Sequence, residues 1–243
     1  MITYNGKNVL QTDVHGGDKF REAYLNSVNR FIEKKLSETY SERESFMTPE
    51  ALVENPEKYR KALLDMLGSP VKEYPTNVPT YEKEFVGSDD FSDIYRMKIE
   101  VMEDFYFYGM LLMPKKRSEK MPLVVAQHGG GSLPEICTDM NGPSVYCNFA
   151  QRALELGMVV FTPQILVWRF DMNTGENQVA IDLPYRRDEV DNKLKKLGLS
   201  ITGLEIFCIR RSIDCLANED FIDADRIGMM RSEEHTSELQ SLY

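Results

Sequence analysis

The stretch PLVVAQHGGG, residues 122–131, decides how the rest of this sequence is interpreted. Leu123 to Ala126 form a short apolar run, which predicts a strand buried on both faces, as in a parallel sheet. His128 follows, and the glycines after it allow a sharp turn that brings backbone N–H groups close to a ligand. Because ligands of open α/β sheets bind at the carboxyl ends of the strands, the stretch predicts a binding site at this turn.

Length, composition and charge limit the class of protein. The 243 residues suffice for one large domain or two small ones, and 42% hydrophobic residues can form a sizeable core. The formal net charge of −10 argues against binding to nucleic acid or to anionic membranes. No apolar run approaches the ~20 residues of a membrane span. Residues 1–13 lack the basic and apolar regions of a signal peptide, so we expect a cytoplasmic protein.

The cysteines show no CxxC spacing, which favours buried free thiols in a reducing compartment over disulfides or metal ligands. They are Cys137, Cys147, Cys208 and Cys215.

Residues 1–76 are predicted to form a helical N-terminal extension. Residues 1–16 are polar and are interpreted as a loop. Residues 18–40 predict a helix with apolar residues at every fourth position, and two shorter helices are expected to follow before Gly68. We expect the extension to pack against a sheet domain, with the shaping of a substrate cleft as the alternative.

From residue 77 the sequence predicts a sheet domain that extends to residue 230. Residues 81–86, 94–101 and 105–113 are expected to be antiparallel strands that lead into the central strand. After the glycine turn, a predicted helix over residues 144–156 and a buried strand over residues 158–162 complete a strand–helix–strand unit.

The next region is expected to line a site and then return to the sheet. Residues 163–199 predict an irregular connection at the carboxyl end of a strand, where Trp168 is a candidate substrate wall, with packing as the alternative role of a lone tryptophan. A long helix over residues 200–217 should carry an Arg210–Asp214 pair, and residues 226–230 predict a further strand. The helix is expected to face the sheet with Ile206, Ile209, Ile213 and Leu216.

Three segments resemble the α/β-hydrolase superfamily, in particular its acetyl-xylan-esterase and dienelactone-hydrolase-like branch. Residues 108–114, YGMLLMP, are similar to the strand and proline that lead into the central strand. Residues 124–135, VVAQHGGGSLPE, resemble the oxyanion turn of that branch, and residues 211–230 resemble the helix and the VDxxRIG strand before the nucleophile elbow. The resemblance implies a partial α/β-hydrolase domain over residues 77–230, with a mostly parallel sheet and flanking helices.

The resemblance also implies a chemistry. In this superfamily the glycine turn donates a backbone N–H to the oxyanion, which implies that His128, Gly129, Gly130 and Gly131 form the oxyanion-hole turn. His128 precedes the nucleophile in the chain, so it is expected to pack and form hydrogen bonds in the turn, not to act as the general base. The implied activity is serine hydrolysis of carboxylic esters, with small-molecule or carbohydrate esters as substrates and no cofactor or metal.

Residues 231–243 depart from the superfamily pattern. A G-x-S-x-G-G elbow should follow Met230, yet the sequence continues as RSEEHTSELQS, without a glycine and with Glu233 at the serine position. The same string matches, codon for codon over residues 231–241, the translation of a common DNA-sequencing adapter. We therefore interpret residues 231–243 as a non-native tail, and not as a source of a Ser232, His235 and Glu238 triad. The nucleophile, acid and base are then absent, and this N-terminal part is predicted to be inactive.

Three other interpretations stay open at this point. A peptidase of the prolyl-oligopeptidase type shares the same core, and nothing before residue 230 excludes it. A non-catalytic nucleotide-binding module would use the glycines for phosphate, but the sequence has neither GxxxxGK[ST] nor GxGxxG. A natural binding protein with a degenerate elbow is disfavoured because the adapter match explains the lost elbow. The acyl and alcohol groups of the substrate and the oligomeric state are not predicted.

Overall fold

The computed structural model of the chain describes residues 2–10, 13–46, 48–129, 132–140, 142, 146–165 and 187–231. The chain divides into two compact units, residues 1–63 and 64–243. This division falls within α3 (Pro56–Leu67), whereas the sequence pattern sets the end of the extension at residue 76. The assignment of residues 1–76, 77–230 and 231–243 as separate domains stays a prediction.

The first unit begins with a β-hairpin that the sequence pattern did not predict. β1 (Ile2–Tyr4) pairs antiparallel with β2 (Lys7–Val9), and Asn5 and Gly6 between them both have positive φ. The loop predicted for residues 1–16 is therefore wrong, because Asn-Gly is the preferred sequence for a tight hairpin turn. A short 3-10 helix, η1 (Val14–Gly17), follows, so the extension is not wholly helical.

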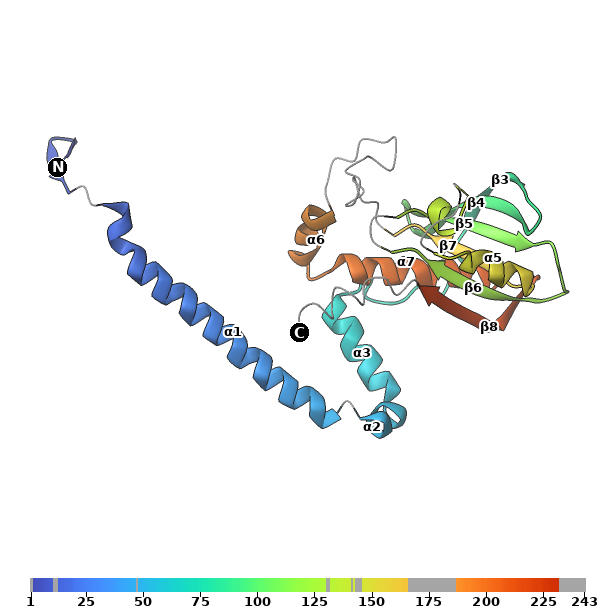
Figure 1. Ribbon diagram of the computed structural model, residues 1–243, viewed down its shortest axis with the longest axis horizontal. Coiled ribbons are helices and arrows are strands. Elements are labelled where there is room, and N and C mark those ends of the chain that lie inside the picture. The colour runs from blue at the N-terminus through green and yellow to red at the C-terminus, as the bar shows by residue number, and fades with distance from the viewer. Residues whose placement is uncertain are drawn as a thin grey trace. The chain divides into compact units, whose positions relative to one another are not determined.

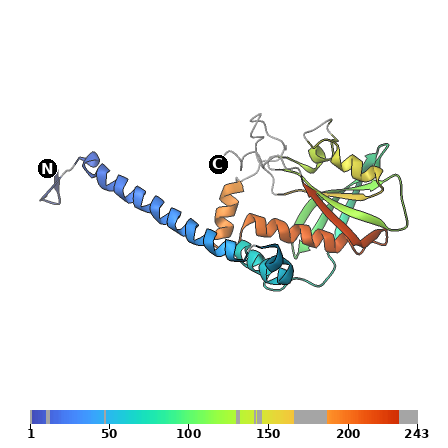
Figure 2. The ribbon, with the colours of Figure 1, turned by 60° about the horizontal axis from the view of Figure 1, so that its bottom comes forward.

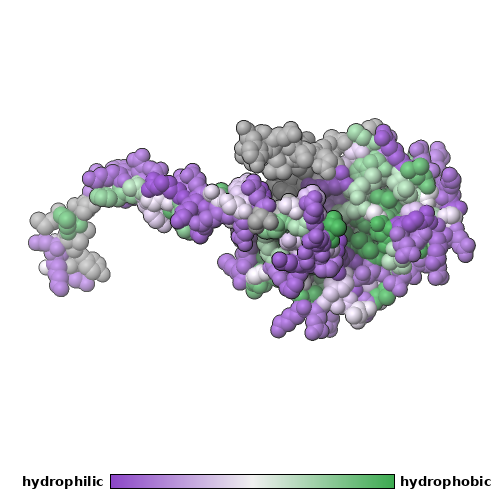
Figure 3. All heavy atoms as spheres, turned by 90° about the horizontal axis from the view of Figure 1, so that it is seen from below, coloured by the Kyte–Doolittle hydropathy of each residue, from purple (hydrophilic) through white to green (hydrophobic). Residues whose placement is uncertain are grey.

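Helices make up the rest of the first unit. α1 (Asp18–Phe46) extends past the predicted end at residue 40, and α2 (Pro49–Glu54) begins where Thr48 Oγ1 accepts the Ala51 N–H at 3.2 Å. Figure 3 shows α1 with mostly hydrophilic side chains and smaller hydrophobic spots. None of the helices in the described part of the chain is both long and apolar enough to cross a membrane.

The second unit is built on a six-stranded mixed sheet with the order β3-β4-β5-β7-β6-β8. Its first strands pair antiparallel, as does β5 with β7, whereas β6 pairs parallel with both β7 and β8. The strands are β3 (Tyr81–Ser88), β4 (Ser92–Met102), β5 (Phe105–Pro114), β6 (Met121–Gln127), β7 (Val159–Pro163) and β8 (Ile222–Arg231).

The parallel register follows the apolar runs of the sequence. Val124 lies opposite Val160 of β7, and Leu123 of the same strand lies opposite Ile227 of β8. β6 is thus the inner strand of a parallel trio, which explains why apolar residues follow one another along it without alternation. The predicted strand–helix–strand unit and the further strand predicted over residues 226–230 are confirmed, and that strand lies beside β6.

Helices cover both faces of the sheet (Figures 1 and 2). α7 (Ile201–Leu216) packs with Phe207, Cys208 and Cys215 against one face, as part of a core that includes Leu123 and Phe161. α5 (Phe149–Glu155) packs on the opposite face with Ala150 and Leu154. A single turn, α4 (Pro134–Cys137), follows the glycine turn, and α6 (Arg187–Lys195) precedes α7.

The structure corrects some details of the predicted helices. α5 begins at Phe149, and the start predicted for this helix, residue 144, lies outside the described residues. α6 lies in a region that was expected to be irregular. On α7, Asp214 pairs with Arg211 at 3.0 Å and not with Arg210 as predicted, because Arg211 is the arginine on the buried face of the helix.

At Gly203, α7 approaches the residue that follows α3 so closely that no side chain would fit between them. A Cβ at Gly203 would lie 2.2 Å from the Gly68 carbonyl oxygen, so glycine is required there. The neighbouring Ser200 caps α7 by accepting the Gly203 N–H, and its hydroxyl donates to the Leu67 carbonyl at 2.6 Å. The end of α3 and the start of α7 are therefore fixed together.

Candidate functional site

The candidate site lies where β6 and β7 end. β6 ends at Gln127 and continues into His128 and Gly129, while β7 ends at Pro163 and continues into Gln164. Because the two strands are parallel neighbours, these residues meet at the same edge of the sheet. His128, Gly129 and Gln164 are all buried, so the start of the turn is enclosed by protein.

The hydrogen bonds of His128 define its tautomer. Its Nδ1 lies 2.8 Å from the Gly129 carbonyl oxygen, which can only accept, so Nδ1 carries the proton. Nε2 is then an acceptor in the neutral ring, and it faces Gln164 Nε2 at 3.4 Å. The same Gln164 amide donates to the Ile165 carbonyl, which fixes its amide orientation. The neutral Nδ1–H imidazole is therefore the form that this environment accommodates.

Burial also favours the neutral imidazole. Desolvation lowers the pKa of His128 below its ordinary value, against smaller opposite effects of the Gly129 carbonyl and of Glu205 and Glu135. Arg187 acts in the same direction as burial. Arg187 itself forms a bidentate ion pair with Glu205, at 2.6 and 2.9 Å, which joins α6 to α7 near this edge.

The backbone of Gly129 is held on both sides. Its N–H donates to Tyr146 Oη at 2.8 Å, and its carbonyl accepts from His128 Nδ1. Tyr146 is only 5% exposed and lies just before α5. The Gly129 N–H therefore already has an acceptor within the protein.

The residues after the turn are also anchored. Tyr108 on β5 donates to Glu135 Oε1 in α4 at 2.6 Å, and Cys137 Sγ lies 3.7 Å from the Ala126 carbonyl oxygen. Ser132 is 8% exposed, and its hydroxyl has no hydrogen-bond partner within the described residues. The segment after the glycines is thus anchored to the sheet through Glu135 and Cys137, while the buried Ser132 hydroxyl has no partner among the described residues.

A second hollow lies away from this edge. A cavity of about 270 Å³ is lined by Tyr74, Pro75, Asn77, Arg211 and Asp214, among others. The N–H groups of Arg211 are used by three backbone carbonyls, those of residues 75, 77 and 101, and by the side chains of Asn77 and Asp214. This arginine fastens the segment before β3 to α7 and keeps no donor for a ligand.

Some predicted site residues cannot be placed. Gly130, Gly131 and Trp168 lie outside the described residues, and so do Ser232, His235 and Glu238. Within the part of the chain that the structure describes, no group of three or more His, Cys, Asp or Glu side chains is arranged to hold a metal ion. Cys137, Cys208 and Cys215 are buried free thiols whose pKa values burial raises to about 12, so they are poor nucleophiles.

Tyr146 and Gln164 were missed as site residues by the sequence analysis. Gln164 carried one usable signal, since it lies two residues after the buried strand predicted over residues 158–162, at the end where ligands bind. Tyr146 carried none, because its contact with Gly129 depends on how α5 packs against the sheet.

The fold is similar to that of solved structures. A protein from Bacteroides fragilis NCTC 9343 that is predicted to be an acetyl xylan esterase matches with a TM-score of 0.57 and 14% identity, over 81% of this chain and 51% of that one. Acetyl xylan esterase 1 from Thermoanaerobacterium sp. JW/SL YS485 has a TM-score of 0.47 and 15% identity, over 73% of this chain and 50% of that one. A glucuronoyl esterase from Solibacter usitatus has a TM-score of 0.47 and 14% identity, over 75% and 53%.

The similarity to the Bacteroides fragilis structure establishes the fold of the second unit as part of an α/β-hydrolase fold. The chain spans about half the length of the solved structures that it resembles. No protein-family model matches the sequence. No curated protein matches it either.

Proposed function

We propose that this chain is the N-terminal part of a serine hydrolase that acts on carboxylic esters, with acetylated carbohydrates as the first substrate class to test. The observation that carries the proposal is the buried His128–Gly129 start of a glycine turn at the carboxyl end of β6. In an α/β-hydrolase fold this is the turn that provides an oxyanion donor. The similarity in fold to a protein predicted to be an acetyl xylan esterase supports the choice of ester.

The proposed reaction divides its work between this chain and a segment beyond residue 230. A serine there would attack the ester carbonyl, with a histidine as base, and the alcohol would leave to give an acyl-enzyme that water hydrolyses. The turn after β6 would stabilise the tetrahedral oxyanion through backbone N–H groups, and loss of one such donor costs about 10²–10³ in rate. Within this chain, His128 would serve as a fixed neutral support of the turn.

The test begins with the gene. Genomic DNA read past codon 230 should encode G-x-S-x-G directly after β8, in place of residues 231–243. The complete protein should hydrolyse p-nitrophenyl acetate and release acetate from acetylated xylan, and replacement of the elbow serine by alanine should abolish both. Genomic DNA that continues with the present residues 231–243 would overturn the proposal.

A substrate comparison separates the esterase from a peptidase. The complete protein should show no turnover of peptide p-nitroanilides with proline before the scissile bond. Turnover of those amides at rates above those of acetyl esters would favour the peptidase of the prolyl-oligopeptidase type.

A further inference from the structure

Tyr146 lies beside the start of the glycine turn and is held in place by contacts with α5. Its ring meets that of Phe149 edge to face, with centroids 5.7 Å apart and planes at 67°, and its carbonyl accepts the Phe149 N–H at 3.2 Å. Phe149 is the first residue of α5, so both the ring and the backbone of Tyr146 are fixed to that helix. The phenol oxygen thereby reaches the Gly129 N–H at 2.8 Å inside the protein.

We propose that Tyr146 is a positioning residue of this hydrolase, which fixes the start of the glycine turn by accepting the Gly129 N–H. The inference rests on the proposed function, but the hydrogen bond itself can be tested without any activity. Both backbone polar groups of Gly129 already have a hydrogen-bond partner: Tyr146 accepts from the N–H, and His128 donates to the carbonyl. Gly129 is therefore a fixed support of the turn and not itself an oxyanion donor.

Loss of the Tyr146 phenol oxygen alone should destabilise the start of the glycine turn. A buried N–H that loses its acceptor keeps its desolvation penalty, and the turn must shift or open to find water. Tyr146→Phe removes only the hydroxyl and keeps the ring against Phe149. The variant should therefore loosen the turn while α5 stays packed on the sheet.

The sequence permits a selective measurement of this bond. His is followed by Gly only at residues 15–16 and 128–129, and Tyr is followed by Gly only at residues 108–109. A chain labelled with ¹³C-carbonyl His and Tyr and with ¹⁵N-Gly will give HNCO signals from Gly16, Gly109 and Gly129 alone. Gly109 lies buried in β5 and reports on the sheet, whereas Gly16 lies exposed in η1.

Amide hydrogen exchange of these glycines tests the hydrogen bond. In Tyr146→Phe, Gly129 should exchange about three- to tenfold faster than in the parent chain, while Gly109 keeps its rate. The matched control is Tyr81→Phe, which removes another tyrosine hydroxyl, the donor to Glu219 at 2.7 Å, and should leave Gly129 unchanged. Equal acceleration of Gly109 and Gly129, or no change at Gly129, would overturn the proposal.

Kinetics of the complete protein test the role in catalysis. Tyr146→Phe should lower kcat for p-nitrophenyl acetate about tenfold with KM unchanged, because the oxyanion donors are misplaced while substrate binding is kept. Tyr81→Phe should keep the parent kcat. An unchanged kcat in Tyr146→Phe would overturn the positioning role. A complete protein that has no esterase activity would instead overturn the proposed function, and the exchange rates would still decide whether Tyr146 fixes the turn.

Discussion

Tyr108 on β5 donates its phenol hydrogen to Glu135 Oε1 at 2.6 Å, and Glu135 lies in the helical turn that follows the glycines. Burial, and then the hydrogen bond to Glu135, raises the pKa of Tyr108 above its ordinary range. The phenol therefore stays a donor throughout the physiological pH range. The antiparallel strand β5 thus anchors α4, the helical turn that follows the parallel strand β6.

Removal of this hydroxyl should destabilise the chain measurably. Tyr108→Phe is expected to lower the free energy of unfolding by about 1–2 kcal/mol, because the Glu135 carboxylate loses the phenol as a hydrogen-bond donor. Urea unfolding followed by circular dichroism measures the change. Tyr24→Phe is the control, since Tyr24 is 70% exposed and should show no effect. Equal stability of Tyr108→Phe and the parent chain would show that the tether contributes nothing.

His128 should make stability depend on pH between neutral and mildly acidic conditions. Its pKa is lowered in the folded chain by burial, so the unfolded chain binds the proton first as the pH falls. The full stability is present above the ordinary histidine pKa of 6.5 and is lost as the pH falls below it, towards the lowered folded value. The slope from one proton cannot exceed ~1.4 kcal/mol per pH unit. Urea unfolding at pH 7.5 and pH 5.5 measures this loss.

A neutral substitution isolates the contribution of His128. His128→Asn keeps an N–H donor near the Gly129 carbonyl but cannot take up a proton in this range. The loss of stability between pH 7.5 and pH 5.5 should therefore be smaller in His128→Asn than in the parent chain. The charged groups near His128, namely Glu205, Glu135 and Arg187, are the same in both chains. An identical loss in both would show that His128 does not titrate as expected.

Adjacent arginines on α7 should differ sharply in their effect on stability. The Arg211 side chain is 2% exposed and donates to three backbone carbonyls, so Arg211→Met leaves these oxygens without a partner. We expect it to cost about 2–4 kcal/mol of unfolding free energy. Arg210 is exposed and lies 4.1 Å above the Tyr74 ring, so Arg210→Met should cost about 0.5–1 kcal/mol. Similar costs in urea unfolding would contradict the assignment of Arg211 as a buried hub.

The contrast between these arginines shows where sequence patterns fail. Of the predicted stripe on α7, Ile209 and Leu216 are buried, whereas Ile206 is only partly buried and lies outside the core. The buried face of the helix instead contains Arg211 and Ser212. A polar residue in a helix is interpreted as exposed unless its partners are known, and the backbone carbonyls that Arg211 binds lie more than a hundred positions away. The β1–β2 hairpin was missed for another reason. Asn5–Gly6 is a strong turn signal, but the segment around it is mostly polar and was therefore interpreted as a loop.

The parallel core could be predicted because continuous apolar runs are rare outside buried strands. The runs around Val124, Val160 and Ile227 predicted the three strands, and the structure pairs them in parallel with that of Val124 in the middle. The site was predictable only as a turn at a strand end. Its hydrogen bonds join Gly129 to Tyr146 and His128 to Gln164, and such pairs form only after the strands and α5 have packed.

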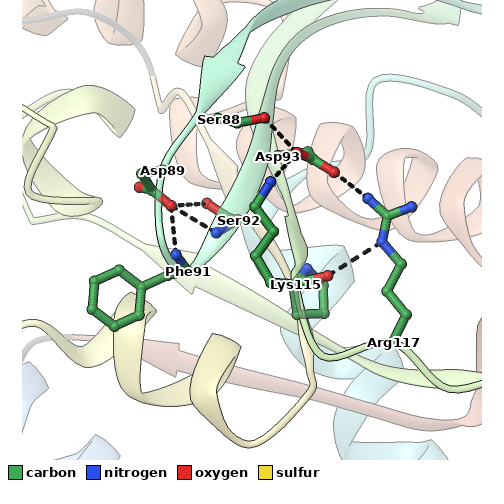
Figure 4. Close-up of polar contacts among 8 residues, drawn as sticks. Ser88, Asp89, Phe91, Ser92, Asp93, Lys115 and Arg117 are labelled. Atoms are coloured by element: carbon green, nitrogen blue, oxygen red, sulfur yellow. Dashed lines mark hydrogen bonds and ion pairs between the residues drawn. The ribbon is translucent and has the colours of Figure 1, made fainter.

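An ion-pair cluster joins the start of β4 to the loop after β5 (Figure 4). The Asp93 carboxylate accepts from Lys115, Arg117 and Ser88. The hydrogen bond from Lys115, and then that from Ser88, lowers the pKa of Asp93. The stability that it contributes is present above the ordinary carboxyl pKa of 3.8 and is lost as the pH falls through the lowered folded value.

Asp93→Asn should therefore lower the melting temperature at pH 7, and the difference from the parent chain should shrink as the pH approaches 3. Added salt should also reduce it, because exposed ion pairs are screened. Asp90→Asn is the matched control, since Asp90 is an exposed aspartate three residues away and should leave the melting temperature unchanged. A difference that grows towards acidic pH would contradict the assigned direction of the Asp93 pKa.

The 243-residue chain itself should not hydrolyse p-nitrophenyl acetate above the rate of a heat-treated sample. The proposal places the nucleophile, acid and base beyond residue 230 of the complete protein, and backbone N–H groups that bind an oxyanion cannot replace a nucleophile. Ser232→Ala should consequently change nothing, whereas alanine at the elbow serine of the complete protein should remove about 10⁴-fold or more of its rate. Initial rates at matched protein concentrations measure both. Turnover by the present chain that Ser232→Ala abolishes would show that residues 231–243 are a working part of the protein, and that the nucleophile was present after all.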